Sequence, residues 1–156
     1  MRKTIISAGR NDLPTPAGGW LDLDRAARVE VISEDPSHPI EAALLPDRGN
    51  GWRASQPGPQ TIRLVFDSPQ FLRRIRLRFV GGTTERTQEF VLRWVGEGLE
   101  SREVVRQQWN FSPSGTNEEL EEYQVDLERV TALELVVTPD VSGGESIASL
   151  AEWRIA

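Results

Sequence analysis

Six side chains near predicted turns have the chemistry to hold a small ligand. They are Trp20, His38, Arg53, Trp109, Asn110 and Phe111. Flat aromatic faces next to polar donors are typical of ligand-binding surfaces, and residues 109–111 open a Pro/Gly-rich loop. Packing competes with binding for each aromatic ring, and a lone loop histidine such as His38 is most often inert. We therefore expect loops, and not a reactive cleft, to meet a ligand.

Arginines on the predicted strands form a second candidate site. The five are Arg63, Arg74, Arg76, Arg78 and Arg93. Residues two apart on a strand project to the same side, about 7 Å from each other, so a shared outer face could bind phosphate groups or a carboxylate-rich partner. The favoured alternative is a solvated face that pairs across the sheet with Glu89 or Glu134. Nucleic acid is disfavoured as a partner, because this face lacks the interleaved aromatic rings of single-strand binders.

Catalytic chemistry has little support in the residue types present. The chain has no cysteine and one histidine, and no serine stands in the setting of a nucleophile elbow. Its glycine-rich turns lack the lysine and the strand–loop–helix setting of a phosphate loop. The net charge of −6 argues against general attraction to nucleic acid or to an anionic membrane, and the acidic run at residues 118–122 is expected on a solvated face. These observations predict a binding protein and not an enzyme.

Alternation of apolar and polar residues predicts strands along most of the chain. Within residues 61–67 and 72–80, apolar side chains recur at every second position. Turn signals such as PDRGNG, SQPGPQ and GGTT separate the predicted strands. This spacing is typical of an antiparallel sandwich, with Trp94 and Trp153, which lie in predicted strands, expected in its core.

The N-terminal part and one acidic segment are harder to assign. Strands are predicted at residues 20–24 and 40–45, although the second segment fits a short helix equally well. Residues 114–122 could hold one helical turn, because Thr116 or Asn117 could cap it and glutamates follow. All 156 residues are expected to form a single domain, with residues 1–27 as an N-terminal extension or an edge strand.

The order of several motifs resembles a known family. A loop ends in Gly51-Trp52-Arg53 and is followed by PQTIRLVFDSPQFLRRIRLRFV, by EFVLRWV, by EEYQVDLERVTALELVVTPD and finally by SIASLAEWRIA. This order is similar to that of discoidin (coagulation factor type C) domains, which are galactose-binding-like jelly rolls. The resemblance covers roughly residues 31–156. It implies an all-β, discoidin-like antiparallel β-sandwich with about eight principal strands, and it places Trp52 in the core, where the family buries a tryptophan.

The resemblance implies a non-catalytic binding module that most often takes a carbohydrate through loops at one end of the sandwich. Two alternatives stay open: an intracellular docking domain for a protein partner, or weak contact with nucleic acid or phosphate through the arginines. No export signal is recognised and no cysteine is present, which favours the cytoplasm and hence a protein partner. No run is apolar enough to span a membrane, and the oligomeric state is left open.

The resemblance also implies a structural calcium ion, with Asp47, Asn50 and Glu152 at the positions of its ligands. Calcium prefers about six to eight oxygen ligands, largely carboxylate and carbonyl. The family's Asp-Gly-Asp pattern is replaced here by Asp47-Arg48-Gly49-Asn50, so one acidic ligand is missing. The alternative is that Asp47 and Asn50 cap a turn while Glu152 pairs with an arginine.

Overall fold

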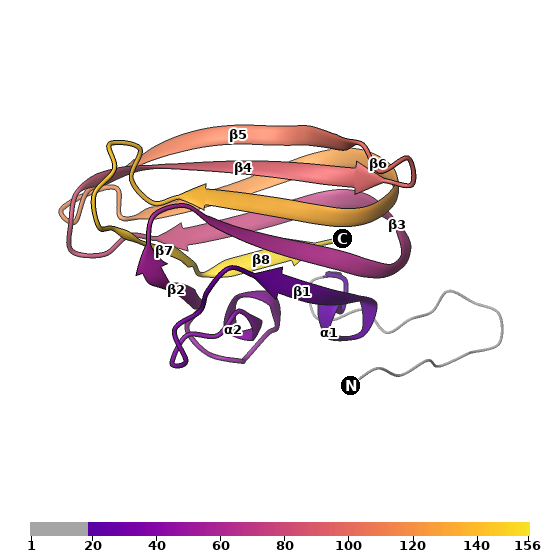
Figure 1. The fold of residues 1–156 in the computed structure, drawn as a ribbon, viewed down its shortest axis with the longest axis horizontal. Coiled ribbons are helices and arrows are strands. Elements are labelled where there is room, and N and C mark those ends of the chain that lie inside the picture. Colours follow the sequence, from indigo (N-terminus) through magenta and orange to yellow (C-terminus); the bar gives the residue numbers. More distant parts are fainter. Residues whose placement is uncertain (1–18) are drawn as a thin grey trace.

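The computed structural model describes residues 19–156, and strands account for most of them. The two longest strands, β3 (Gln60–Val80) and β6 (Glu118–Thr138), pair antiparallel along most of their length. Both turn back on themselves at the same end of the molecule (Figure 1), where their register shifts between Val65 and Arg74. The bend of β3 contains Pro69. Proline is tolerated there because it cannot donate a ladder hydrogen bond and the ladder is interrupted at the bend. Each long strand therefore contributes one half to each layer of a sandwich.

The larger layer has the strand order β1–β3–β6–β4–β5. It contains β1 (Ala27–Val31), the first half of β3, the second half of β6, β4 (Arg86–Gly96) and β5 (Ser101–Phe111). The smaller layer contains β8 (Glu152–Ile155), the second half of β3 and the first half of β6. Every one of these pairings is antiparallel, which confirms the predicted all-β sandwich.

The apolar rows of the two layers face each other in a single core. Buried rows from both halves of β3 include Ile62, Leu64, Phe66, Ile75, Leu77 and Phe79. Phe79 stacks on Phe90 of β4, with ring centroids 5.2 Å apart. Trp52 and Trp153 are fully buried and Trp94 packs against the core, as expected. Removing these side chains from water is the main force that holds the layers together.

A small sheet and a short helix close one end of the sandwich. The sheet pairs β2 (Trp52–Pro57) with β7 (Ile147–Leu150) in antiparallel fashion (Figure 1). The helix is α2 (Glu41–Leu44), whose alanines and leucine are buried. The two strands of this small sheet come from segments about 90 residues apart in the sequence. The packing of the sheet against the sandwich fixes where the exposed side chains of both strands lie.

Several local predictions are wrong. A helical turn, α1 (Leu23–Ala26), stands where a strand was expected, because the side chain of Asp22 caps it by accepting from the backbone N–H of Asp24. Of the two alternatives left open for residues 40–45, the short helix is the one present, as α2. Residues 114–122 hold no helical turn but a turn followed by the start of β6. The strand expected over residues 147–155 divides at Ala151 into β7 and β8.

The expectation for the N-terminal segment is only partly covered by the structure. Residues 1–18 of the expected extension lie outside the described residues. Among the described residues, β1, which starts at Ala27, pairs only with β3 and lies at the edge of the larger layer. No helix in the described part of the chain is long and apolar enough to cross a membrane.

Candidate ligand-binding groove

Two adjoining hollows form a groove at the end of the sandwich that carries the β2–β7 sheet. Their volumes are about 410 Å³ and about 440 Å³, within the range of about 300–1,000 Å³ that is common for small-molecule sites. Arg53, Val80, Gly81 and Ser149 line both hollows. We call the combined hollow the Arg53 groove, because Arg53 belongs to both of its parts.

β2 positions the central residue of this groove. Trp52 points into the core, where only 1% of its surface is exposed and its Nε1 donates to the carbonyl of Ser33 at 3.1 Å. Successive residues of a strand face opposite sides, so Arg53 is exposed. The backbone N–H of Arg53 donates to the carbonyl of His38 (3.1 Å), and its carbonyl accepts from the N–H of Asp35 (2.8 Å). These bonds bring His38 into the lining of the groove.

Glycines form part of the groove wall after the end of β3. The N–H of Gly81 donates to the carbonyl of Asn117 at 2.9 Å. A Cβ atom at Gly81 would lie 2.3 Å from Oδ1 of Asn117 and 2.8 Å from the ring of Phe111, so a larger residue does not fit there. Gly82, by contrast, borders open space. The bare backbone at Gly82 lets a ligand approach the chain closely, whereas the space beside Gly81 is already filled by Asn117 and Phe111.

Arg53 differs from the other arginines of the groove in being free of partners. Its guanidinium makes no hydrogen bond or ion pair with any residue in the range 19–156. Arg78 is held at 3.1 Å from the carboxylate of Glu118. His38 lies beside Asp35, with 3.8 Å between Nδ1 and Oδ2, and this contact is an ion pair only when the imidazole is protonated.

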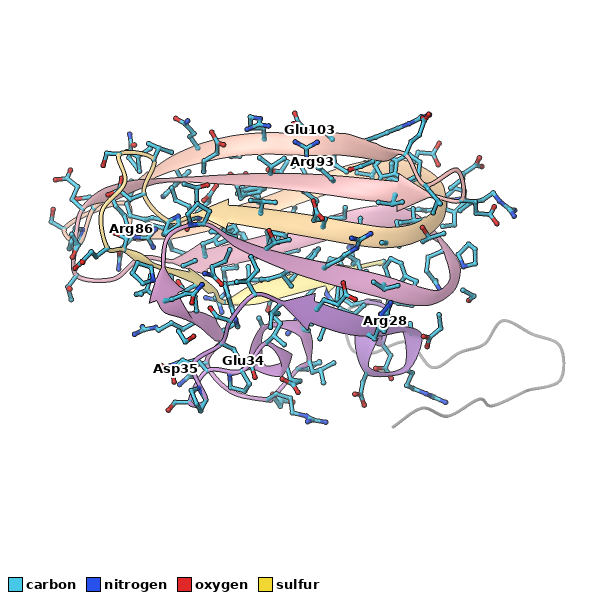
Figure 2. The ribbon with its side chains drawn as sticks, viewed as in Figure 1. Arg28, Glu34, Asp35, Arg86, Arg93 and Glu103 are labelled. Atoms are coloured by element: carbon cyan, nitrogen blue, oxygen red, sulfur yellow. The ribbon has the colours of Figure 1, made fainter. Side chains whose placement is uncertain are left out.

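Arg86 stands at the inner side of the groove and is buried (Figure 2). Its Nη1 donates to the carbonyl of Pro139 at 2.6 Å, and its guanidinium lies 4.6 Å from the ring centroid of Phe111. Burial lowers the pKa of the Arg86 guanidinium, while the charge of Asp140 acts in the opposite direction. Arg86 therefore adds fixed positive charge behind the groove.

Only part of the predicted ligand set meets in the Arg53 groove. His38 and Arg53 line it, and so does Asn50, which was expected near a metal. Ser149 and the Gly81-Gly82 turn were not predicted. The pattern GGTT after a strand marked a turn, but nothing in the sequence indicated that it would lie against β2 and β7.

The expected ligand loop at residues 109–111 is the end of β5 and not a loop. Phe111 is fully buried and Trp109 half-buried on the inward face, while Asn110 is exposed on the outward face. Oδ1 of Asn110 accepts from Oγ1 of Thr87 at 2.6 Å. Because alternate residues of a strand point apart, the three side chains cannot contact one ligand, and Phe111 is a core residue.

Trp20 is likewise a packed side chain and not an open platform. Only 7% of its surface is exposed. The guanidinium of Arg74 lies 3.9 Å from its ring centroid and that of Arg76 lies 5.1 Å away. These cation–π contacts cover the ring and fix Arg74 against it. Trp20 does not line the Arg53 groove, so it is not among the residues that converge there.

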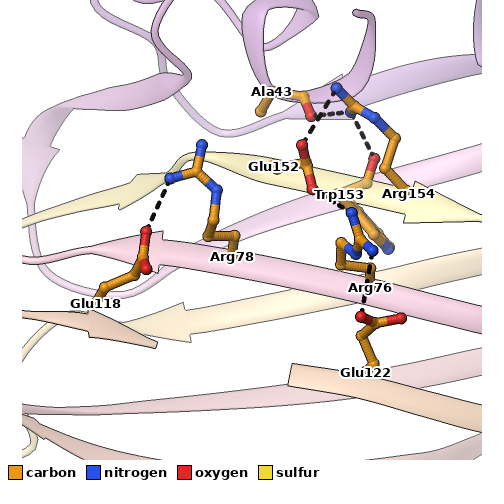
Figure 3. A network of polar contacts seen from close by, with 8 residues as sticks. All are labelled: Ala43, Arg76, Arg78, Glu118, Glu122, Glu152, Trp153 and Arg154. Atoms are coloured by element: carbon orange, nitrogen blue, oxygen red, sulfur yellow. Dashed lines mark hydrogen bonds and ion pairs between the residues drawn. The ribbon is translucent and has the colours of Figure 1, made fainter. Parts of the chain in front are cut away.

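The five arginines do not form one patch, because the two halves of β3 lie in different layers. Arg63 and Arg93 flank Glu134 in register on the larger layer, where Arg93 also opposes Glu103 (Figure 2). On the smaller layer, Arg76 contacts Glu122 at 3.2 Å and Arg78 contacts Glu118 (Figure 3). Arg74 covers Trp20. Arg76 and Arg78 are paired with glutamates, but with partners other than the expected Glu89 and Glu134. The arrangement divides the proposed anion patch.

The acidic run is only partly solvated. Glu118 and Glu122 are exposed and pair with arginines of β3, as expected for a surface face. Glu119 is fully buried. Burial and the neighbouring Glu121 raise the pKa of Glu119 to about 8.

The residues at the implied calcium site do not fit the ion. The implied ligands were Asp47, Asn50 and Glu152. The carboxylate of Glu152 lies 3.6 Å from Arg76 and 3.8 Å from Arg154 (Figure 3), which is the arginine pairing named as the alternative. Nη1 of Arg154 also donates to the carbonyl of Ala43 at 2.8 Å. Within residues 19–156, no three His, Cys, Asp or Glu side chains are grouped so that they could hold a metal.

Comparison with known proteins identifies the fold. No protein-family model and no curated sequence matches the chain. Among solved structures, it is similar to CBM32-3 of a family 31 glycoside hydrolase from Clostridium perfringens, with 15% identity, a TM-score of 0.64, and 87% of this chain and 93% of that chain covered. The chain folds as a discoidin-like jelly roll. The motif resemblance seen in the sequence is thereby confirmed at the level of fold.

Two further similar structures contain bound ligands. One is the family 32 carbohydrate-binding module of C. perfringens NanJ in complex with galactose, with 15% identity, a TM-score of 0.59, and 83% of this chain and 92% of that chain covered. The other is the family 32 module of AlyQ in complex with 4,5-unsaturated mannuronic acid, with 18% identity, a TM-score of 0.60, and 84% and 95% covered. At these identities, the similarity concerns the backbone arrangement of the jelly roll.

Proposed function

We propose that this protein is a non-catalytic carbohydrate-binding module and that its sugar binds in the Arg53 groove. The observation that carries the proposal is the convergence of His38, Asn50, Arg53 and Ser149 on one open hollow at an end of the sandwich. The similar structures that are carbohydrate-binding modules, two of them with a bound sugar, support this assignment.

The groove offers the donors and acceptors that sugar hydroxyl groups need. The amide of Asn50 and the hydroxyl of Ser149 can each donate and accept, and the guanidinium of Arg53 can donate several hydrogen bonds in one plane. The bare backbone at Gly82 leaves room for a ring to lie close to the chain. A rigid two-stranded sheet holds Arg53 and Ser149, which are directly paired across β2 and β7, so the site needs little reordering on binding.

A glycan array followed by calorimetry tests the proposal, with a matched pair of variants. Asn50→Ala removes an amide from the groove, whereas Asn110→Ala removes one from the exposed face of β5, outside the groove. We expect Asn50→Ala to weaken the best saccharide by about three- to tenfold, because one neutral hydrogen bond contributes about 0.5–1.5 kcal/mol. Asn110→Ala should leave the affinity unchanged.

Two results would reject the assignment. If no saccharide on the array binds, the carbohydrate function is wrong. If saccharides bind but Asn110→Ala weakens them while Asn50→Ala does not, the function stands and the site is misplaced.

A further inference from the structure

We propose that the Arg53 groove selects an acidic sugar, a uronic acid, and that Arg53 binds its carboxylate. This inference rests on the proposed carbohydrate function and adds the chemical class of the sugar. It is carried by the charges that line the groove, by the free guanidinium at its centre and by the lack of an aromatic platform.

The lining of the groove is positive although the protein is acidic. The chain carries a net charge of −6. Yet arginines outnumber acidic residues in its lining: the first hollow contains Arg53 and Arg78 and no acidic residue, and the second contains Arg53, Arg86 and a single glutamate, Glu145. A positive hollow on an acidic surface concentrates anions locally.

Arg53 is the arginine that is available to a ligand. The guanidinium of Arg78 is held by Glu118 at 3.1 Å and that of Arg86 by the carbonyl of Pro139 at 2.6 Å. Arg53 is exposed and contacts no partner within residues 19–156. Its planar fork matches the two oxygens of a carboxylate, and such bidentate, charge-assisted bonds are shorter and stronger than neutral ones. Arg78 and Arg86 are engaged with these partners, so they do not compete with Arg53 for the carboxylate oxygens of a ligand.

The groove also lacks the aromatic face on which a neutral sugar ring would stack. Trp52 is 1% exposed and Phe111, behind Gly81, is fully buried. Val80 is the large apolar residue that remains exposed, at 41% of its surface. A neutral sugar would therefore gain mainly hydrogen bonds that it already makes with water, and these contribute little net free energy. A carboxylate on Arg53 adds the charge-assisted contact that this groove can supply.

The test compares each uronic acid oligosaccharide with uncharged partners of the same shape. A panel of galacturonate, glucuronate, mannuronate and guluronate oligosaccharides is titrated by calorimetry, together with their methyl esters and the corresponding neutral oligosaccharides. We expect at least one uronate to bind about tenfold or more tightly than its methyl ester. That difference should shrink as the salt concentration rises, because ions screen an exposed charge pair.

Two variants then assign the preference to a residue. Arg53→Gln removes the free charge from the groove, and Arg102→Gln removes a charge from an exposed residue at the start of β5, outside the groove. We expect Arg53→Gln to abolish the difference between uronate and methyl ester while Arg102→Gln keeps it. The thermal midpoint of each variant is measured alongside, so that a folding defect is recognised.

The possible outcomes separate this inference from the proposed function. Equal binding of uronates and neutral sugars would keep the carbohydrate function and overturn the acidic preference. A preference for uronates that survives in Arg53→Gln would overturn the role of Arg53. Equal binding of a sulfated saccharide would show that the groove reads negative charge in general, against the assignment of a carboxylate. No binding to any saccharide would overturn the proposed function as well.

Discussion

Trp52 and Arg53 are neighbours in the sequence with opposite environments, and their separation accounts for the position of the groove. The indole of Trp52 fills the core and is fixed to Ser33 by its N–H. Arg53 emerges on the other side of β2, between two hollows. The buried ring anchors the strand and thereby fixes the point from which the guanidinium extends.

A second feature at the scale of single residues is the buried carboxyl of Glu119. Nε2 of Gln88 lies 3.5 Å from Oε1 of Glu119. Glu121 is close enough to share a hydrogen bond with it and, together with burial, raises its pKa to about 8. Burial and these two carboxyls also raise the pKa of Tyr123. Glu119 therefore keeps its proton in the folded protein at neutral pH.

The stability of the protein should consequently depend on pH through Glu119. Between the ordinary pKa of a glutamate and about 8, the folded state holds a proton that the unfolded state has lost. The free energy of unfolding should then fall as the pH rises, by up to about 1.4 kcal/mol per pH unit, and level off above the folded pKa. Glu119→Gln, which stays neutral, should become progressively more stable than the wild type between pH 5 and pH 8.

Urea unfolding at several pH values measures this difference. Glu128→Gln serves as the control, because Glu128 is an exposed glutamate of the same strand. A difference between Glu119→Gln and the wild type that stays constant from pH 5 to pH 8 would contradict the account.

Arg154 performs a structural task that the sequence resemblance assigned to a metal. Its guanidinium, with only 13% of the side chain exposed, links the carbonyl of Ala43 in α2 to the carboxylate of Glu152 in β8 (Figure 3). Burial lowers the pKa of Arg154 and Glu152 raises it again. The positive charge beside the carboxylate of Glu152 is thus supplied by an arginine of the chain itself.

We therefore predict that calcium has no effect on stability while Arg154 has a large one. Arg154→Met keeps an unbranched stem but leaves a buried carbonyl without its donor, and should lower the free energy of unfolding by about 2 kcal/mol. Thermal unfolding in calcium and in chelator should give the same midpoint for the wild type. A midpoint that rises with calcium, and no longer rises in Glu152→Gln, would restore the metal site.

At the scale of elements, the end piece depends on close contact between the loop before β2 and the link between β7 and β8. Gly51 has a φ of +95°, and a Cβ atom there would lie 2.7 Å from the carbonyl oxygen of Leu150 and 2.9 Å from the Cα of Ala151. Gly58, at the other end of β2, has a similar φ of +93° but borders open space. The two glycines therefore share the backbone requirement and differ only in packing.

This pair provides a matched test of the packing. Gly51→Ala should destabilise the protein by about 1–3 kcal/mol more than Gly58→Ala, because overpacking adds to a backbone strain that both variants share. Chemical unfolding of both variants measures the difference. Equal losses of stability would mean that the loop moves away from β7 at little cost, and that the groove wall is softer than described.

The strands could largely be predicted from the sequence, and the bends between them could not. Alternating apolar residues revealed both halves of β3, because each half buries one face. The same alternation gives no sign that Arg63 and Arg78 face opposite sides of the molecule, since that depends on the fold-back near Pro69. α1 was missed because a cap at Asp22 outweighs the strand pattern.

The candidate site was predictable only where chemistry and exposure coincide in one residue. His38 and Arg53 were chosen for their side chains and lie in the groove. Phe111 was chosen for the same reason and is core, because its strand continues to that residue and turns the ring inward. Gly81 and Ser149 carry no distinctive chemistry and enter the site only through their position next to β2.

At the scale of the whole molecule, the sandwich is a support that carries the Arg53 groove at one end. Both layers share one core through β3 and β6, so the layers cannot move independently without opening it. The groove collects residues from four separate segments: the turn at His38, β2, the end of β3 and β7. A site of this kind is assembled by folding, and binding should change its backbone little.

The most direct test of the central claim, that a saccharide binds in the Arg53 groove, is an NMR titration of ¹⁵N-labelled protein with the tightest-binding saccharide. We predict that the largest amide shift changes fall on Arg53, Gly81, Gly82 and Ser149, with little change at Asn110 or on the outer faces of the layers. Shift changes centred on β5 or on the arginines of the larger layer, or no change at saturating saccharide, would contradict the account.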